Sequence, residues 1–237
     1  MVKDIPAVFF DMGSTLVFDR GFANFLSKNL SETLEENTGR KFSSQEILDA
    51  WSKSNIHGEE IETWDLTRSM FLIRYLGLTP TPQLVELAYK AVLKSYVEGF
   101  ELDSDALETL ARVKEMGFKL GIITNVGSYE IVKDRLAEVG LIRYVDVLVA
   151  SQAVIWKKPH RKIFEWSCFL ANVSPAEAIH VGDDPKADIE GAKNAGLRAI
   201  QVLKKAAAKS PIADAWVYSV KEVPRVLEEW LSTGYIR

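Results

Sequence analysis

Apolar residues follow two different patterns along this chain of 237 residues. The apolar run 7–10 ends at Asp11 and predicts a short buried strand. From about residue 21 to residue 99, apolar residues instead recur at helical spacing. The pattern there predicts four helices. The first begins near Phe22, the second follows a capping box at 43–46, and the third and fourth cover 61–76 and 84–97.

After residue 99, segments of strand and helix character alternate. Predicted helices cover 104–116, 129–139, 161–171, 185–195 and 224–231, and predicted strands cover 120–123, 145–150, 178–181, 199–203 and 215–218. This alternation is typical of an α/β fold, a Rossmann-like parallel sheet flanked by helices. The chain therefore divides into an α/β core, residues 1–16 and 100–237, and an all-helical insert, residues 17–99.

Composition excludes several classes of protein. A net charge of −4 disfavours a nucleic-acid partner, which requires a basic face. The single cysteine, Cys168, excludes an intramolecular disulfide, and its apolar neighbours favour burial. No apolar run is long enough for a membrane span, and no targeting segment precedes the first strand, so we expect no membrane association and a cytoplasmic location. The oligomeric state does not follow from the sequence.

Four separated segments have polar residues that suit one chemistry. They are 9–16 (FFDMGSTL), 121–125 (GIITN), 157–159 (KKP) and 180–188 (HVGDDPKAD). Three of them lie where a predicted strand ends, which in a parallel α/β sheet is the ligand-binding edge. Together they provide carboxylates, a hydroxyl and an ammonium group, a set that suits magnesium-assisted phosphoryl transfer.

The order and spacing of these segments resemble the haloacid dehalogenase superfamily over nearly the whole chain. The family pattern is Asp-x-Asp-x-Thr, a strand ending in Thr or Ser, a Lys, and Gly-Asp-x-x-x-x-Asp. The matching residues are Asp11, Thr15, Thr124, Lys158, Asp183 and Asp188. The resemblance implies that the helical insert is a cap domain of the C1 type, which closes over the site.

The same resemblance implies a role for each matching residue. Asp11 would be the nucleophile that forms an aspartyl-phosphate, and Thr124, Asn125 and Lys158 would bind the phosphoryl group. Mg²⁺ would be held by Asp11, the Gly13 carbonyl and Asp183. Thr15, Asp184 and Asp188 would not bind the ion directly but would orient these ligands.

Ordinary structural roles exist for the same residue types. Asp11 would suit a helix cap, and the lysines at 157–158 a solvated loop. Acidic residues near 183–188 would suit a helix N-terminus, which favours negative charge. A helix dipole accounts for one acid better than for three, so the combined pattern favours the catalytic interpretation.

One departure from the family pattern concerns the general acid. Gly13 stands where most phosphatases of the family have a second aspartate, which protonates the leaving group. General acid assistance contributes about 10²–10⁴-fold in rate. Candidate replacements are Asp19, just beyond the loop, and three residues of the insert: His57, Glu59 and Glu60.

The sequence predicts a magnesium-dependent phosphohydrolase acting on a small phosphorylated metabolite. One alternative is a haloacid dehalogenase, since dehalogenases also lack the second aspartate, although they bind no metal. A C–P hydrolase would need an imine-forming lysine in the cap, for which Lys53 is available. A non-catalytic protein that binds a phosphorylated ligand is the remaining alternative. We expect most of the aromatic residues of the insert to pack in its core: Trp51, Trp64, Phe71 and Tyr75.

Overall fold

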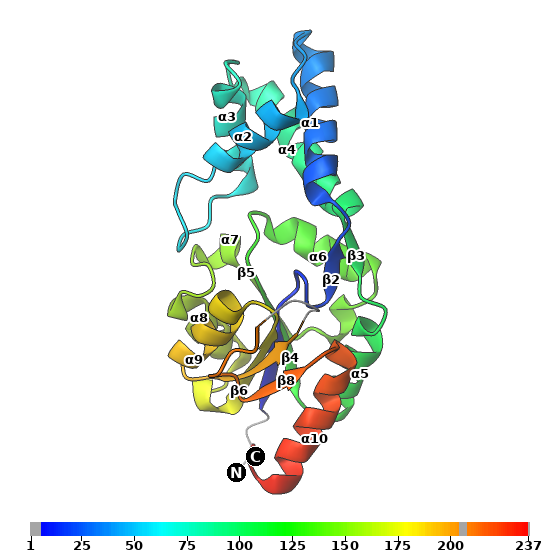
Figure 1. The fold of residues 1–237 in the computed structure, drawn as a ribbon, viewed down its shortest axis with the longest axis vertical. Coiled ribbons are helices and arrows are strands. Elements are labelled where there is room, and N and C mark those ends of the chain that lie inside the picture. Colours follow the sequence, from blue (N-terminus) through cyan, green and yellow to red (C-terminus); the bar gives the residue numbers. More distant parts are fainter. Residues whose placement is uncertain (1–5, 204–207, 237) are drawn as a thin grey trace.

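A six-stranded parallel sheet forms the centre of the α/β part (Figure 1). The computed structural model describes residues 6–203 and 208–236. The strands lie in the order β5-β4-β1-β6-β7-β8. Their bounds are Ala7–Phe10 (β1), Lys119–Thr124 (β4), Val147–Ala150 (β5), Ala178–Gly182 (β6), Arg198–Val202 (β7) and Ala215–Val217 (β8). The predicted α/β fold class is therefore confirmed.

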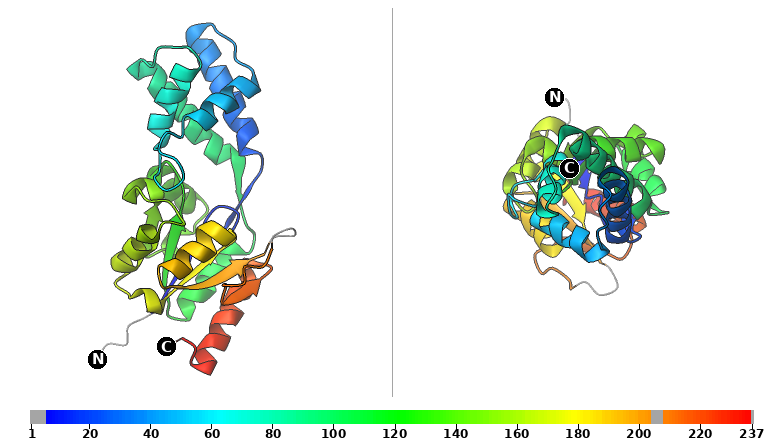
Figure 2. Two further views of the ribbon diagram at one scale, coloured as in Figure 1. Left: turned by 60° about the vertical axis from the view of Figure 1, so that its left-hand side comes forward. Right: turned by 90° about the horizontal axis from the view of Figure 1, so that it is seen from above.

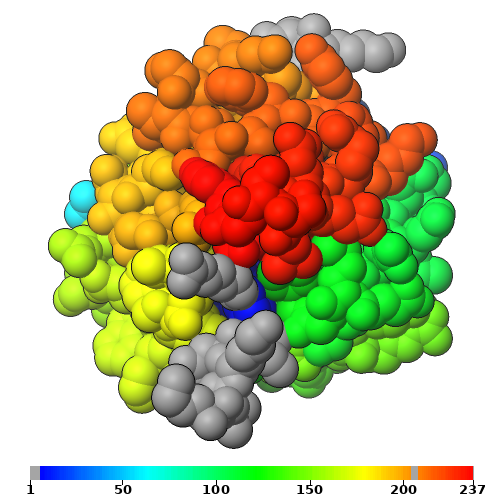
Figure 3. All heavy atoms as spheres, turned by 90° about the horizontal axis from the view of Figure 1, so that it is seen from below, coloured from blue at the N-terminus to red at the C-terminus, as the bar shows by residue number. Residues whose placement is uncertain are grey.

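Helices cover both faces of this sheet. Successive residues of β1 point to opposite faces, so its side chains pack against both layers of helices. Val8 and Phe10 pack against α5 (Ala106–Glu115), α6 (Tyr129–Glu138) and α10 (Val223–Thr233). Ala7 and Phe9 pack against α8 (Arg161–Ala171) and α9 (Gly191–Asn194), which continues a π-helical segment, Pro185–Glu190. Seen from below, α10 lies beside α5 at the end of the molecule opposite the insert (Figure 3).

The helical insert lies above the carboxyl ends of the strands (Figures 1 and 2). It consists of α1 (Phe22–Thr38), α2 (Ser44–Lys53), α3 (Asp65–Tyr75) and α4 (Pro82–Gly99). A separate apolar cluster that includes Leu30, Ile47, Leu72 and Val92 holds these four helices together. Two short antiparallel strands, β2 (Val17–Asp19) and β3 (Phe100–Leu102), connect the insert to the core. The sequence pattern did not predict this pair, since each strand has only three residues.

Two details of the insert differ from expectation. The third helix begins at Asp65 and not at residue 61, because Ile61 pairs with Trp156 of the core as an isolated bridge. The expected core packing of the aromatic residues is correct for Trp51, which is buried under Arg68, but wrong for Trp64, Phe71 and Tyr75. These three are on the surface at 46%, 37% and 50% exposure.

The capping box predicted for the second helix is present. The Ser43 hydroxyl accepts from the Glu46 N–H, and Glu46 Oε2 accepts from the Ser43 N–H at 2.8 Å. Cys168 is buried as expected, and burial raises the pKa of its thiol to about 12. In the part of the chain that the structure describes, no helix has the length and apolar character needed to cross a membrane.

Candidate active site

Three of the predicted site residues follow the carboxyl ends of adjacent strands. Asp11 follows β1, Thr124 ends β4, and Asp183 follows β6. Asp11 continues the β1–β6 pairing by one residue, since its N–H donates to the Val181 carbonyl at 2.8 Å. Because β1 lies between β4 and β6, parallel pairing places these residues along one edge of the sheet.

Lys158 connects two carboxylates in the interior of this edge. Its Nζ lies 2.5 Å from Asp11 Oδ1 and 2.7 Å from Asp188 Oδ1, and it donates to the Ile123 carbonyl at 2.9 Å. All three ammonium protons therefore have an acceptor. Lys158 and both aspartates are buried. The structure thus brings two of the predicted site residues, Lys158 and Asp11, into direct contact.

Asn125 holds the backbone of Lys158. Its side-chain oxygen accepts from the Lys158 N–H at 2.8 Å, and its amide nitrogen donates to the Lys158 carbonyl at 3.0 Å. This pair of bonds fixes the segment after α7 (Ser151–Val154) against the end of β4. Sequence reasoning assigned Asn125 to phosphate binding and missed this positioning role, because the two residues are 33 positions apart.

Asp188 is fixed by three neighbours. Besides Lys158, its Oδ1 contacts His180 Nε2 at 2.9 Å, and its Oδ2 accepts from the Asp184 N–H at 3.0 Å. Its close approach to β6 requires a glycine, since a Cβ at Gly182 would lie 2.3 Å from Asp188 Cγ. This contact explains why the Gly-Asp motif begins with glycine. The role of His180 was missed, because a histidine inside a buried strand gives no distinct signal in sequence.

The other predicted residues lie at the margin of this cluster. The Asp184 carboxylate is exposed and accepts from the N–H groups of Lys186 and Ala187 at 2.8 and 2.7 Å, so it caps the following helix. Thr15 is buried, and its hydroxyl has no hydrogen-bond partner among the described residues. Gly13 is half-buried, and a Cβ built on it would meet no atom within 4 Å.

The buried charges differ in protonation behaviour. Burial raises the pKa of Asp11 to about 7, although the charge of Lys158 opposes this rise. Burial would also raise the pKa of Asp188, but Lys158 and His180 outweigh it, and this pKa lies well below its usual range. Burial lowers the pKa of His180, so its imidazole is neutral at pH 7 and donates through Nε2.

The carboxylates of this cluster suit a hard divalent cation. One oxygen from each of Asp11, Asp183 and Asp188 lies within 4.8 Å of the others. Three carboxylates and one ammonium group leave two negative charges when all are ionised, which a divalent cation would neutralise. Oxygen ligands of this kind are those that Mg²⁺ prefers.

The segment between α2 and α3 contacts the core beside this edge. Ser151 Oγ donates to Glu62 Oε2 at 2.5 Å, and the Lys157 N–H donates to the Glu60 carbonyl at 2.8 Å. The proposed substitute acids of the insert, His57, Glu59 and Glu60, all have exposed side chains. Glu59 pairs with Lys186 at 3.2 Å.

Two further candidates from the sequence also lie on the surface. Asp19 accepts from the N–H groups of Gly21 and Phe22, both at 2.6 Å, and so caps the start of α1. Lys53 is exposed. The structure gives none of these surface groups a position inside the carboxylate cluster.

Comparison with known proteins identifies the family. The model of the haloacid dehalogenase-like hydrolases matches residues 10–202, and the chain belongs to this family. A glyceraldehyde 3-phosphate phosphatase from Methanopyrus kandleri is 28% identical over 212 residues, which cover 84% of each chain. Human N-acylneuraminate-9-phosphatase is 26% identical over 235 residues, or 94% of each chain. The chain is a hydrolase, and these relatives confirm the expected phosphatase class.

A solved structure confirms the fold. The 2-haloacid dehalogenase from Pseudomonas syringae pv. Tomato DC3000 superimposes with a TM-score of 0.78 at 23% identity, covering 95% of this chain and 99% of that one. At this level of identity the similarity concerns the fold and not the reaction.

Proposed function

We propose that this hydrolase removes the phosphoryl group from a small phosphorylated metabolite, with Mg²⁺ as cofactor. The observation that supports this proposal best is the position of Lys158 between Asp11 and Asp188, beside Asp183. The relatives named as phosphatases match most of the chain. A dehalogenase would have no use for a carboxylate cluster that suits a cation.

In the proposed reaction, an Asp11 oxygen attacks phosphorus while the bond from phosphorus to the leaving oxygen breaks. The product is an aspartyl-phosphate and an alcohol, whose oxygen takes its proton from water because Gly13 has no side chain. A second water then attacks the phosphorus and releases inorganic phosphate, which restores the Asp11 carboxylate. Lys158 balances negative charge on the phosphoryl oxygens during both steps.

We propose that Asp11, Asp183 and the Gly13 carbonyl hold the magnesium ion. The bound ion would neutralise charge on the phosphoryl group. Thr124 and Asn125 would contact the phosphoryl oxygens, and Thr15 and Asp188 would support the ligands. For the domains, we propose the predicted boundaries, with residues 17–99 as a C1-type cap over a core of 1–16 and 100–237.

The test is hydrolysis of p-nitrophenyl phosphate with and without Mg²⁺, in the wild type and in Asp11→Asn. We expect activity that requires both Mg²⁺ and Asp11. A matched control is Asp49→Asn, which removes an exposed carboxylate at the surface of α2. Equal rates in wild type and Asp11→Asn would refute the proposal. Release of halide from a 2-haloacid in the presence of a chelator would instead indicate the dehalogenase.

A further inference from the structure

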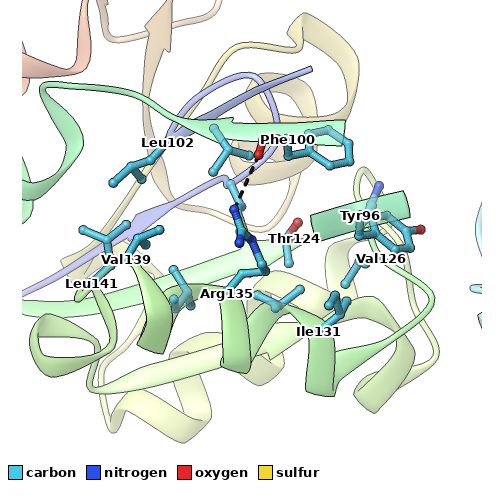
Figure 4. Close-up of a pocket in the computed structure, with 15 residues that line it drawn as sticks. Tyr96, Phe100, Leu102, Thr124, Val126, Ile131, Arg135, Val139 and Leu141 are labelled. Atoms are coloured by element: carbon cyan, nitrogen blue, oxygen red, sulfur yellow. Dashed lines mark hydrogen bonds between the residues drawn. The ribbon is translucent and has the colours of Figure 1, made fainter. Parts of the chain in front are cut away.

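An apolar cavity of about 100 Å³ adjoins the candidate active site (Figure 4). It is bounded by Gly13, by Thr124 at the end of β4, by the β2–β3 pair and by α6. In the view of Figure 4, Val139 and Leu141 lie at one end and Tyr96 and Val126 at the other. The cavity thus reaches from the phosphoryl-binding strand end into the apolar packing beneath the connecting strands.

Gly13 leaves this cavity open toward the site. Gly13 belongs to the cavity lining, and a Cβ at this position would meet no atom within 4 Å other than those of its chain neighbours. Gly13 is also two residues from Asp11, the proposed nucleophile. A leaving group attached to phosphorus at Asp11 therefore has space beside Gly13.

The lining is mainly apolar, with four polar or charged residues, Tyr96, Thr124, Asn125 and Arg135, and it therefore disfavours a ligand with many hydroxyl groups. Arg135 is the charged side chain of the lining, and it already pairs with Glu138 at 2.5 Å and donates to the Phe100 carbonyl at 3.5 Å. The Asn125 amide already bonds the Lys158 backbone. Polyol hydroxyls placed among Val132, Leu136 and their neighbours would lose their hydrogen bonds to water without replacement.

We infer that this cavity binds the organic group of the substrate, and that the substrate is a phosphomonoester with a short apolar group of about three or four carbons. The inference rests on the proposed phosphatase function. A dry cavity of about 150 Å³ accepts benzene, so about 100 Å³ fits a somewhat smaller group. Burying each methylene contributes about fourfold in binding, from its transfer free energy.

The experiment measures kcat/KM for methyl, ethyl, propyl, butyl and benzyl phosphate, and for glycerol phosphate. The alcohols of the linear series have similar acidity, so chain length mainly reports binding. We expect kcat/KM to rise about fourfold per methylene to propyl or butyl phosphate and to fall for benzyl phosphate. Propyl phosphate should exceed glycerol phosphate by at least about tenfold, since two hydroxyls would be buried without partners. A flat series, or preference for glycerol phosphate, overturns the inference.

Two matched variants test whether the preference for chain length arises in this cavity. Leu136 and Leu110 are both fully buried in the same apolar cluster, but only Leu136 lines the cavity. Relative to each variant's own rate on methyl phosphate, Leu136→Ala should shift the optimum to longer groups, and Leu110→Ala should not. Val139→Phe, which fills the cavity, should shorten the optimum. An unchanged optimum in both cavity variants overturns the inference.

The proposed function has a separate control. If Asp11→Asn abolishes activity on all esters while chain length has no effect, the phosphatase proposal stands and the inference on the substrate fails. If the wild type hydrolyses none of the esters, or if Asp11→Asn is equally active, both fail.

Discussion

Asp65 should make the stability of this protein depend on pH. Its side chain is fully buried at the first residue of α3, where α3 meets the core loop after β4. The Asp65 N–H donates to the Gly127 carbonyl at 2.9 Å, and a Cβ at Gly127 would lie 2.4 Å from Asp65 Oδ1. Neither carboxylate oxygen has a hydrogen bond of good geometry among the described residues, although the Tyr96 side chain interacts with this carboxyl group and favours its charged form slightly. A carboxylate in this position is costly to ionise.

The magnitude follows from the pKa of Asp65. Burial raises this pKa from 3.8 to about 7, although the nearby charge of Arg68 opposes the rise. Because the folded protein holds the proton more tightly, the contribution of Asp65 to stability is largest below its ordinary pKa of 3.8 and is lost as the pH rises to about 7. At about 1.4 kcal/mol per unit, the full loss is about 4 kcal/mol. About 3 kcal/mol of it falls between pH 5 and pH 8.

The assay compares the urea unfolding of wild type and Asp65→Asn at pH 5 and at pH 8. Asparagine has a similar shape and no charge, so the difference in unfolding free energy should change by about 3 kcal/mol in favour of the variant at pH 8. The raised pKa of Asp11 contributes equally to the pH dependence of both unfolding free energies, so its contribution cancels in their difference. Asp49→Asn, an exposed carboxylate, should show no such change. Parallel pH profiles for wild type and Asp65→Asn would refute the reasoning.

Three other predictions concern the candidate site. Mg²⁺ at 100 times its dissociation constant should stabilise the wild type by about 2.7 kcal/mol, measured by thermal unfolding, and Asp183→Asn should lose this shift. Lys158→Met should destabilise the protein by about 3–5 kcal/mol in urea, because two buried aspartates lose their partner; a loss below 1 kcal/mol would contradict this. Gly13→Asp should raise kcat for methyl phosphate, whose leaving group is small, by up to about 10²-fold, with little change for p-nitrophenyl phosphate, whose leaving group needs no acid. Equal effects on both substrates would show that the new carboxylate does not act as the acid.

The elements that the sequence predicts well are those with long, regular apolar patterns. The helix expected over 161–171 has those bounds in the structure, and the strand 7–10 is β1. The parallel direction of the strands follows from the alternation of strands and helices. The short β2 and β3 were missed, because three-residue strands contain too few positions to show a period.

The start of the third helix shows why a helix boundary cannot always be predicted from the local sequence. Residues 61–64 have the apolar spacing of the helix that follows, but they contact the core instead. Ile61 pairs with Trp156, and the Glu62 N–H donates to the Ile155 carbonyl at 2.8 Å. These partners lie more than 90 positions away, so a local pattern contains no information about them. Tertiary contact decides the boundary here.

The candidate site likewise contains residues that the sequence predicts and residues that it does not. Asp11, Lys158 and Asp188 belong to recognisable motifs, and the structure places them in contact. His180 and the backbone contacts of Asn125 belong to no pattern that a single sequence reveals. Both act on residues that were predicted, by orienting Asp188 and by fixing the Lys158 backbone.

The different protonation of the two aspartates explains why these supporting contacts matter. Asp11 and Asp188 share one ammonium group, yet Asp188 has two further donors, His180 Nε2 and the Asp184 N–H. Hydrogen bonds to the charged form lower a carboxyl pKa. Lys158 therefore contacts one acid whose pKa lies well below its usual range and one whose pKa is raised, and the protein stabilises the charge of Asp11 less than that of Asp188. The carboxyl group with fewer donors has an oxygen available to bond to phosphorus, so this difference supports the proposal that Asp11 is the nucleophile.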